Sequence, residues 1–323
     1  MRRITPALAV SALAALTLAG CSPAGSASSD ECTRSVSGGS STADLVQVSG
    51  DIDSPPTVDL RTPLHTKSTK FDDVETGTGT AITEDGQLVV LDLTIVGGAD
   101  GETLFKTGYD QSMTQVLPLS DWTAPIPGLA DALECATEGS RVVAVIGPDD
   151  IDPGAASSIG LAEGDSAVAV IDVRKVYRTK ADGQDQFVEG HGLPTVVRAA
   201  DGTPGIIIPD GNPPEEVVVE VLKKGDGEVV TGDAPVRVHY TGVTWAEKEV
   251  FDTTWGKAPA SLTVEGVVVG FGQALEGQTV GSQILVVIPP ESGYGDQARG
   301  NIPANSTLVF VIDILGIDAV PAE

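Results

Sequence analysis

The strongest constraint on the fold is a weak internal repeat that runs through most of the chain. A β-rich series that begins at Gly77 is matched, in the same order and with similar spacing, by a second series that begins at Gly225. In the clearest matching pair, 139–146 and 281–288, a Gly-Ser dipeptide leads into an apolar run. Such ordered recurrence indicates two copies of one folded module. The 323 residues have room for two units of about 130 residues each, an ordinary domain size.

Within each copy, apolar and polar residues alternate mainly as they do in strands. In 236–241, Tyr240 falls on one face of a strand and His239 on the other, so we expect His239 to be a surface residue. The segment 271–275 is spaced as a short helix with one apolar face. Gly272 inside it costs about 1 kcal/mol relative to alanine, and the sequence offers no reason for it. The prediction is an α+β fold in which each module is an antiparallel twisted sheet wrapped on one short helix.

The start of the chain has the features of an export signal. Two arginines precede a mostly apolar stretch that is too short to cross a bilayer. The four residues Leu-Ala-Gly-Cys that end at Cys21 resemble a bacterial lipobox, whose cysteine is acylated. We therefore expect 1–20 to be a signal peptide, and 21–49 to be a lipidated, flexible linker that holds the protein outside the cytoplasm at the bacterial cell membrane. An ordinary signal peptide with a chance cysteine is the alternative.

The remaining cysteines form an even pair if Cys21 carries a lipid. A disulfide between Cys32 and Cys135 is then the prediction for an oxidising compartment. The alternative is two separate thiols, with Cys135 buried as a small apolar side chain.

Charge and motif content exclude several classes of partner and reaction. The formal net charge of −27 argues against a nucleic-acid partner. The aspartates at 149, 150 and 152 lack the spacing of a calcium loop, so no metal site is expected. Neither a nucleophile elbow nor a phosphate-binding glycine loop is present, so no cofactor is expected either.

Short motifs follow one another in a fixed order through the second copy. They are Val238-His239-Tyr240-Thr241-Gly242, Phe251-Asp252, Gly270-Phe271, Val280-Gly281, Pro290, Tyr294-Gly295, Ile302-Pro303 and Thr307-Leu308-Val309-Phe310. Taken in this order, they resemble the FKBP family of peptidyl-prolyl cis-trans isomerases over roughly residues 215–318.

The resemblance implies an apolar pocket that receives a prolyl ring. By this likeness, Tyr240, Phe251, Phe310 and Val267 or Val268 line the pocket, Phe271 forms its floor, Tyr294 binds a substrate carbonyl, Asp252 lies at the edge and Ile302 in the flap. Rotation about a prolyl amide needs no proton transfer, only passage over a resonance barrier of about 18–20 kcal/mol. A pocket that fits the twisted amide lowers this barrier.

The second copy also departs from the family pattern. The floor position, most often tryptophan in the family, is Phe271, and Ala260 stands where a second pocket aromatic is expected. The stretch 264–270 is slightly shorter than in the family. Which of Val267 and Val268 offers its backbone N–H to the substrate therefore stays open.

The first copy departs further. Leu93, Lys106 and Ala169 occupy the positions of the pocket tyrosine, aspartate and phenylalanine. We therefore expect a degenerate module at 50–180 and an isomerase domain at 190–318, acting on proline-containing polypeptides and assisting the folding of exported proteins. The alternative is a non-catalytic peptide-binding chaperone or adaptor lipoprotein. Oligomeric state is not predicted.

Overall fold

The computed structural model describes residues 32–35, 43–110, 112–188, 190 and 192–320. The expected signal peptide, the lipidation site Cys21 and most of the expected linker lie outside the described residues. The described residues form two large β-sheets, of six and seven strands, and two two-stranded sheets. Among the described residues, no helix is long and apolar enough to cross a membrane.

The first module is built on a six-stranded sheet. Its elements are β1 (Val46–Ser49), β2 (Thr57–Leu60), β3 (Lys70–Glu75), β4 (Leu88–Gly97), β5 (Thr103–Lys106), β6 (Leu117–Pro118), α1 (Leu119–Thr123), α2 (Leu129–Leu133), β7 (Arg141–Ile146), α3 (Pro153–Ser158) and β8 (Ala167–Val176). The strand order is β3-β7-β8-β4-β5, β6 also pairs with β4, and every pairing is antiparallel.

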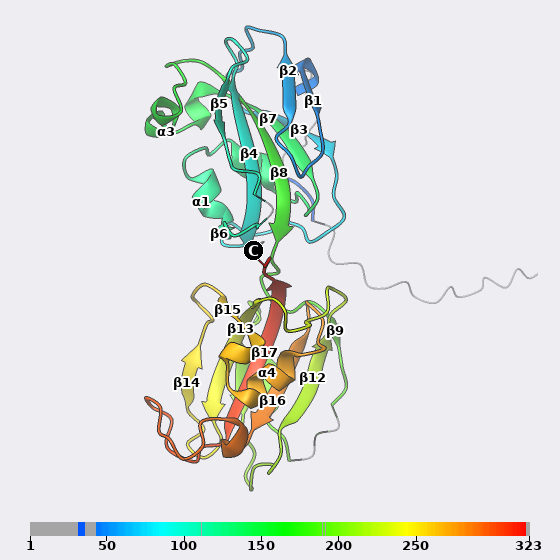
Figure 1. Ribbon diagram of the computed structural model, residues 1–323, viewed down its shortest axis with the longest axis vertical. Helices are drawn as coiled ribbons and strands as arrows, with labels where there is room; N and C mark the ends of the chain where they lie inside the picture. The colour runs from blue at the N-terminus through cyan, green and yellow to red at the C-terminus, as the bar shows by residue number, and fades with distance from the viewer. Residues whose placement is uncertain (1–31, 36–42, 111, 189, 191, 321–323) are drawn as a thin grey trace, which may run out of the picture. The chain divides into compact units, whose positions relative to one another are not determined.

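The second module is built on a seven-stranded sheet (Figure 1). Its elements are β9 (Gln184–Asp185), β10 (Thr195–Arg198), β11 (Pro204–Ile207), β12 (Val218–Lys224), β13 (Val236–Thr244), β14 (Val250–Thr253), β15 (Ala260–Leu262), α4 (Val269–Leu275), β16 (Gln283–Ile288) and β17 (Leu308–Ile317). The order is β14-β13-β17-β16-β12-β9, with β15 paired to β13, and all pairings are antiparallel.

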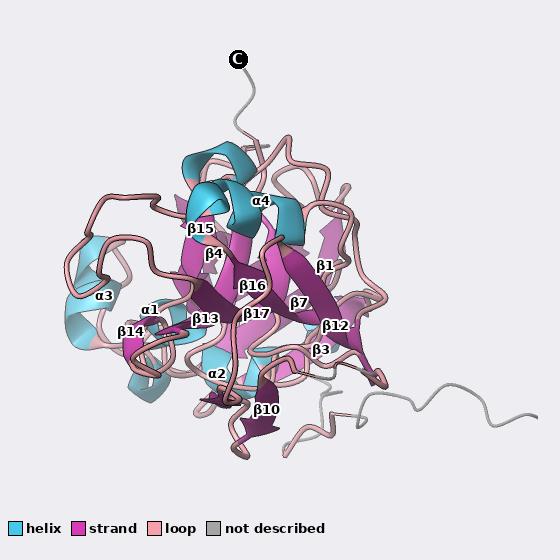
Figure 2. Cartoon of the chain, turned by 90° about the horizontal axis from the view of Figure 1, so that it is seen from below, coloured by secondary structure: helices cyan, strands magenta, loops and turns pink. Residues whose placement is uncertain are grey.

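The internal repeat corresponds to a shared strand order. The sequence repeat aligns β4 with β13 and β7 with β16. In both sheets the last long strand lies between these two strands: β8 lies between β4 and β7, and β17 lies between β13 and β16. The register agrees as well, since Arg141 faces Asp172 in the first sheet and Gln283 faces Asp313 in the second. The expected α+β class is confirmed, and strands account for most of the regular structure (Figure 2).

The first module has more helix than the sequence pattern predicts. Helix α2 occupies the place of α4, but α1 and α3 are additional. Leu119 and Trp122 of α1 are buried in the core of this module, and Ala155 and Ala156 of α3 pack against it. Apolar side chains from these two helices thus fill space that a single short helix would leave empty.

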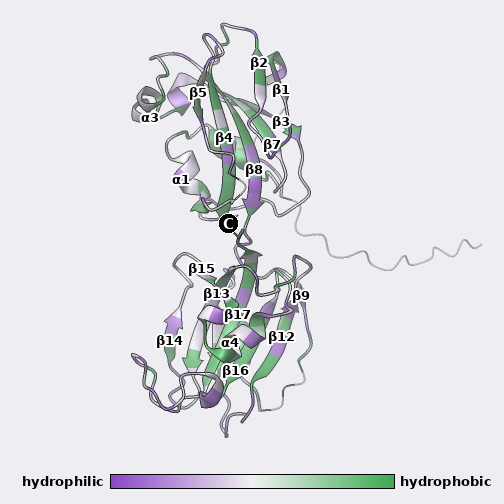
Figure 3. Cartoon of the chain, in the orientation of Figure 1, coloured by the Kyte–Doolittle hydropathy of each residue, from purple (hydrophilic) through white to green (hydrophobic). Residues whose placement is uncertain are grey.

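Each sheet is covered on both faces, which explains its long apolar strands (Figure 3). In β16, Val286 and Ile288 belong to the core beneath α4, whereas Leu285 and Val287 belong to a separate cluster beneath the β10–β11 hairpin. Figure 2 shows α4 and β10 on opposite sides of β16 and β17. The β1–β2 hairpin covers the first sheet in the same way. Strand β1 thus forms where the sequence predicts the end of a linker.

Polar side chains anchor each hairpin to its sheet. Buried Arg141 binds both carboxylate oxygens of Asp172, with Nε–Oδ1 at 2.5 Å and Nη2–Oδ2 at 2.7 Å, and also donates to the hairpin carbonyl of Asp51 at 3.0 Å. In the second module the arginine comes from the hairpin instead. Arg198 Nε donates to Gln283 Oε1 at 2.6 Å, and Gln283 Nε2 donates to Asp313 Oδ1 at 2.7 Å.

The second module begins before the boundary that the sequence suggests. Gln184 and Asp185 form strand β9 and pair with Lys224 and Lys223. The N–H of Ala181 donates to buried Asp313 at 2.8 Å. The polar composition of β9 resembles a linker because β9 is an exposed edge strand.

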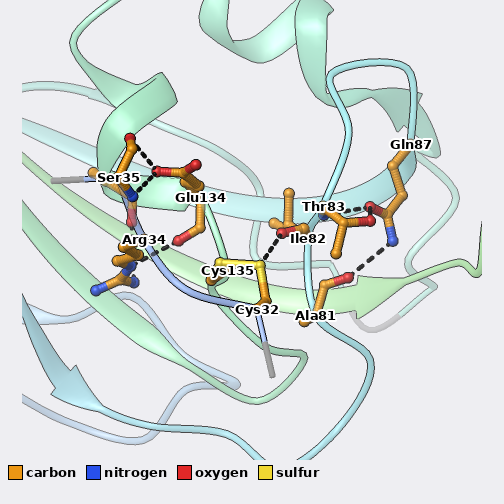
Figure 4. The surroundings of a disulfide bond; sticks show 10 residues. Cys32, Arg34, Ser35, Ala81, Ile82, Thr83, Gln87, Glu134 and Cys135 are labelled. Atoms are coloured by element: carbon orange, nitrogen blue, oxygen red, sulfur yellow. Dashed lines mark hydrogen bonds between the residues drawn. A yellow bond between two sulfur atoms is a disulfide. The ribbon is translucent and has the colours of Figure 1, made fainter. Parts of the chain in front are cut away.

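Cys32 and Cys135 form a disulfide across 103 residues, the pairing expected from the cysteine count (Figure 4). Neighbouring contacts hold the same segment on the first module. Arg34 donates to both carboxylate oxygens of Asp73 at 2.7 and 2.8 Å, and the N–H of Ser35 donates to Glu134 at 2.7 Å.

Candidate functional site

Four aromatic rings meet on the α4 side of the second sheet. They come from three strands and a helix: Tyr240 of β13, Phe251 of β14, Phe310 of β17 and Phe271 of α4. Phe310 is central, with ring centroids 5.4 Å from Phe251, 5.1 Å from Phe271 and 6.0 Å from Tyr240. The pairs are close to edge-to-face, a favourable arrangement for aromatic rings.

A glycine makes this packing possible. Gly242 pairs with Phe310 in the register of β13 and β17. A Cβ atom at Gly242 would lie 2.6 Å from Cζ of Phe251 and 2.7 Å from Cε1 of Phe310, closer than real contacts allow. The two phenylalanine rings therefore occupy the space that any other residue would fill.

A β-bulge brings Phe251 and Asp252 to the same site. Val243 pairs with Val250 and Gly242 with Asp252, so Phe251 is an extra residue in β14. Simple alternation would place neighbouring side chains on opposite faces, whereas a bulge re-aims them. Phe251 contacts Phe310, and Asp252 accepts a hydrogen bond of 2.5 Å from the Tyr240 hydroxyl.

The Tyr240 hydroxyl donates its proton in the hydrogen bond to Asp252. Burial raises its pKa, and the hydrogen bond to Asp252 and the negative charge of that carboxylate raise it further. Tyr240 therefore stays protonated at any physiological pH and orients Asp252 at the edge of the aromatic cluster.

The segment 290–303 forms the other side of the site. Tyr294 is half-buried and packs against the core beneath α4, and Ile302 is 6% exposed within that core. The backbones of Arg299 and Ile302 exchange two hydrogen bonds of 2.9 Å, which closes a tight turn. The guanidinium carbon of Arg299 lies 5.7 Å from the Tyr294 ring centroid.

Val267 and Val268 enter the site just before α4. Both side chains are half-buried against the core, and the carbonyl of Val268 accepts from the N–H of Phe271 at 2.9 Å. Within the described part of the chain, the hydrogen bonds outside helices and strands include none from the N–H of either valine. Ala260 also packs against this core.

The structure explains Gly272, for which the sequence offers no reason. A Cβ atom there would lie 2.6 Å from the carbonyl oxygen of Val264, in the short 3₁₀ turn Val264–Gly266. Glycine allows this turn to approach α4 closely.

The expectation that His239 is a surface residue is wrong. His239 does point away from Tyr240, but it is only 9% exposed, because Trp255 stacks on its ring at 4.6 Å. Its Nδ1 lies 2.9 Å from Oγ1 of Thr254, and that oxygen accepts from the N–H of Tyr240 at 2.9 Å. Burial lowers the pKa of His239 to about 4. His239 thus helps to hold the backbone of Tyr240.

The matching positions of the first module form no such site. Leu93 and Ala169 are buried in the core, together with Trp122. The expected match of Lys106 to Asp252 is wrong by one residue, because Phe105 pairs with Ile95 as Asp252 pairs with Gly242. No hydroxyl or carboxylate replaces the Tyr240–Asp252 pair at these positions. Among the described residues, no group of three or more His, Cys, Asp or Glu side chains is placed to hold a metal ion.

Comparison with known proteins agrees with the family resemblance that the sequence motifs of the second module indicate. Residues 225–315 match the family model of the FKBP-type peptidyl-prolyl cis-trans isomerases. A probable FK506-binding protein of Corynebacterium glutamicum is 34% identical over 113 residues, which are 35% of this chain and 96% of that protein. An FK506-binding protein of Streptomyces anulatus is 32% identical over 119 residues, again 35% and 96%.

Among solved structures, the crystal structure of FkpA from Escherichia coli matches 41% of this chain and 55% of that chain, with 30% identity and a TM-score of 0.32. The two FK506-binding proteins are matched over nearly their whole length, and the expected resemblance is confirmed. The chain therefore belongs to the family of FKBP-type peptidyl-prolyl cis-trans isomerases.

Proposed function

We propose that the second module carries the isomerase site and acts on X-Pro bonds of polypeptides. The observation that supports this most directly is the cluster of Tyr240, Phe251, Phe271 and Phe310, which offers an apolar site beside two polar groups. The first module lacks these side chains at the matching positions.

The chemistry of the site suits rotation about an amide bond. The planar amide is stabilised by charge-separated resonance, and an apolar site disfavours that form. Walls that fit the rotated amide bind the transition state more tightly than either ground state. No nucleophile or general base is required for this reaction, and the uncatalysed step takes tens to hundreds of seconds.

The two tyrosines of the site have different roles. The Tyr240 hydroxyl is used by Asp252. The Tyr294 hydroxyl makes no hydrogen bond within the described residues, so it is free to donate to a substrate carbonyl. This supports the role that the family resemblance implies for Tyr294.

The proposed setting is the outer face of a bacterial cell membrane. The lipobox-like residues that end at Cys21 support lipid anchoring, and slow prolyl isomerisation limits the folding of many exported chains. Proline-containing exported polypeptides are therefore the proposed clients.

The test compares variants of residues 32–323 in an assay of cis-trans exchange in a short, uncharged X-Pro peptide. We expect acceleration by the wild type and a loss of at least about tenfold in kcat/KM for Asp252→Ala and for Phe251→Ala. Phe105→Ala is the control and should keep full activity, because Phe105 pairs with Ile95 in the first module as Asp252 pairs with Gly242 in the second. A loss in Phe105→Ala would move the site to the first module. No acceleration by a folded wild type would favour the peptide-binding alternative.

A separate prediction concerns Gly242. In Gly242→Ala the added methyl group would push apart Phe251 and Phe310, so we expect kcat/KM to fall about tenfold or more and the second module to lose about 1–3 kcal/mol of stability. Activity and urea unfolding measure the two effects. Gly86→Ala is the control, because an added Cβ atom there meets nothing within 4 Å. Unchanged activity in Gly242→Ala would show that the close packing of the two rings is not needed for catalysis.

A further inference from the structure

The site contains an isolated positive charge. In 258–323, Arg299 is the only lysine, arginine or histidine, in a chain whose formal net charge is −27. Glu291 and Asp296 are the acidic residues of the same loop, and both are exposed. A single cation at this position is therefore not part of a general basic surface.

Arg299 lies next to the groups that contact the substrate in the proposed function. Its guanidinium lies over the Tyr294 ring, and its backbone is tied to Ile302 by two hydrogen bonds. The aromatic ring attracts the cation, and the tight turn restricts where the backbone can go. The guanidinium is thus held over the ring of Tyr294, which packs against the same core as the aromatic cluster.

The charge of Arg299 is available to a ligand. Two other arginines of the second module have carboxylate partners, since Arg198 lies 3.5 Å from Asp185 and Arg237 lies 2.9 Å from Asp318. Arg299 is exposed and forms no ion pair within the described residues. Its five N–H donors can bind both oxygens of a carboxylate at once.

We propose that Arg299 makes the enzyme prefer X-Pro bonds with an acidic side chain next to the proline. This inference rests on the isomerase site proposed above and adds its substrate class. The acidic surface as a whole repels acidic peptides, but salt screens that repulsion beyond about 8–10 Å. A contact between Arg299 and a substrate carboxylate acts at much shorter range. Asp252, at the edge of the cluster, would disfavour the carboxylate on its own side, so one flanking position should show the preference.

The experiment uses residues 32–323 and peptides in which glutamate, glutamine or lysine stands directly before or directly after the proline. Exchange measured by NMR needs no coupled protease, whose own specificity would interfere. We expect kcat/KM for the glutamate peptide to exceed that for the glutamine peptide by about two- to fivefold at one of the positions, the range for an exposed ion pair. In Arg299→Gln this ratio should fall to one or below, with the glutamine peptide unaffected, and 1 M salt should reduce the wild-type ratio.

Lys224→Gln is the matched control. It removes the same charge from β12, which lies toward the opposite edge of the sheet from β13 and β14, and it should leave the ratio unchanged. A uniform loss for all peptides in Arg299→Gln would assign Arg299 to positioning Tyr294 and overturn the inference. An unchanged ratio in Arg299→Gln, or a wild-type ratio of one at both positions, would also overturn it. Turnover of the glutamine peptide tests the proposed function independently, and its absence in the wild type would refute both proposals.

Discussion

Loss of the Cys32–Cys135 disulfide is expected to lower the unfolding free energy of the first module by about 4 kcal/mol. The bond joins residues 103 positions apart, so it removes a large amount of conformational freedom from the unfolded chain. In the folded state, Arg34 and Ser35 would still bind Asp73 and Glu134, so the native contacts change little. The effect should therefore appear mainly through the unfolded state.

Urea unfolding of the double variant Cys32→Ala, Cys135→Ala measures this loss. Trp122 is the one tryptophan of the first module and reports its unfolding, whereas Trp245 and Trp255 report the second. The transition of the second module serves as the internal control and should not move. A loss below about 1 kcal/mol in the first module would show that the cross-link does not constrain its unfolded chain as the entropy model requires.

Acidification is expected to destabilise the second module through His239. The pKa of His239 is about 4 in the folded protein, against an ordinary value of 6.5. Below pH 6.5 the unfolded chain takes up a proton that the folded state, with its buried neutral ring, does not. The stability that this histidine contributes is therefore complete above pH 6.5 and is lost as the pH falls to 4, by about 2–3 kcal/mol.

The measurement is urea unfolding between pH 7 and 4, followed by the fluorescence of Trp255, which stacks on His239. Carboxylates also titrate toward the acidic end of this range, so the informative quantity is the difference between the wild type and His239→Gln. Glutamine keeps a side-chain group that can hydrogen-bond Thr254 but takes up no proton. We expect the variant to lose about 2–3 kcal/mol less than the wild type over this range. If the unfolding free energies of the wild type and His239→Gln fell equally with pH, His239 would titrate normally in the folded protein.

The sequence alone predicts the two-module organisation because the evidence for it lies in the order and spacing of residues along the chain. Alternating apolar residues indicate strands, and the matched order of two series indicates two copies of one module. The aromatic site residues could be named because their motifs follow a familiar order. The lipid on Cys21, the membrane location and the client proteins stay predictions, since the described residues bear on none of them.

Other features of the fold depend on contacts between distant segments, which the pattern of apolar and polar residues along the chain does not encode. The short strand β9 is polar because it lies at a sheet edge, so composition alone assigns it to a linker. The first module gains α1 and α3 because their apolar side chains fill its core, although the repeat predicts only one helix. Burial on both faces of each sheet arises from hairpins that lie outside the repeat.

The sequence by itself determined which residue types the site contains and which module contains them, because these are properties of the chain read in order. Only the tertiary structure decided how they face one another. One extra residue in β14 turns both Phe251 and Asp252 toward the aromatic cluster, against strand alternation. Trp255 covers His239, which the same alternation would leave in solvent. In both cases the outcome depends on register and on loop packing between neighbouring strands, and these are fixed only when the strands meet.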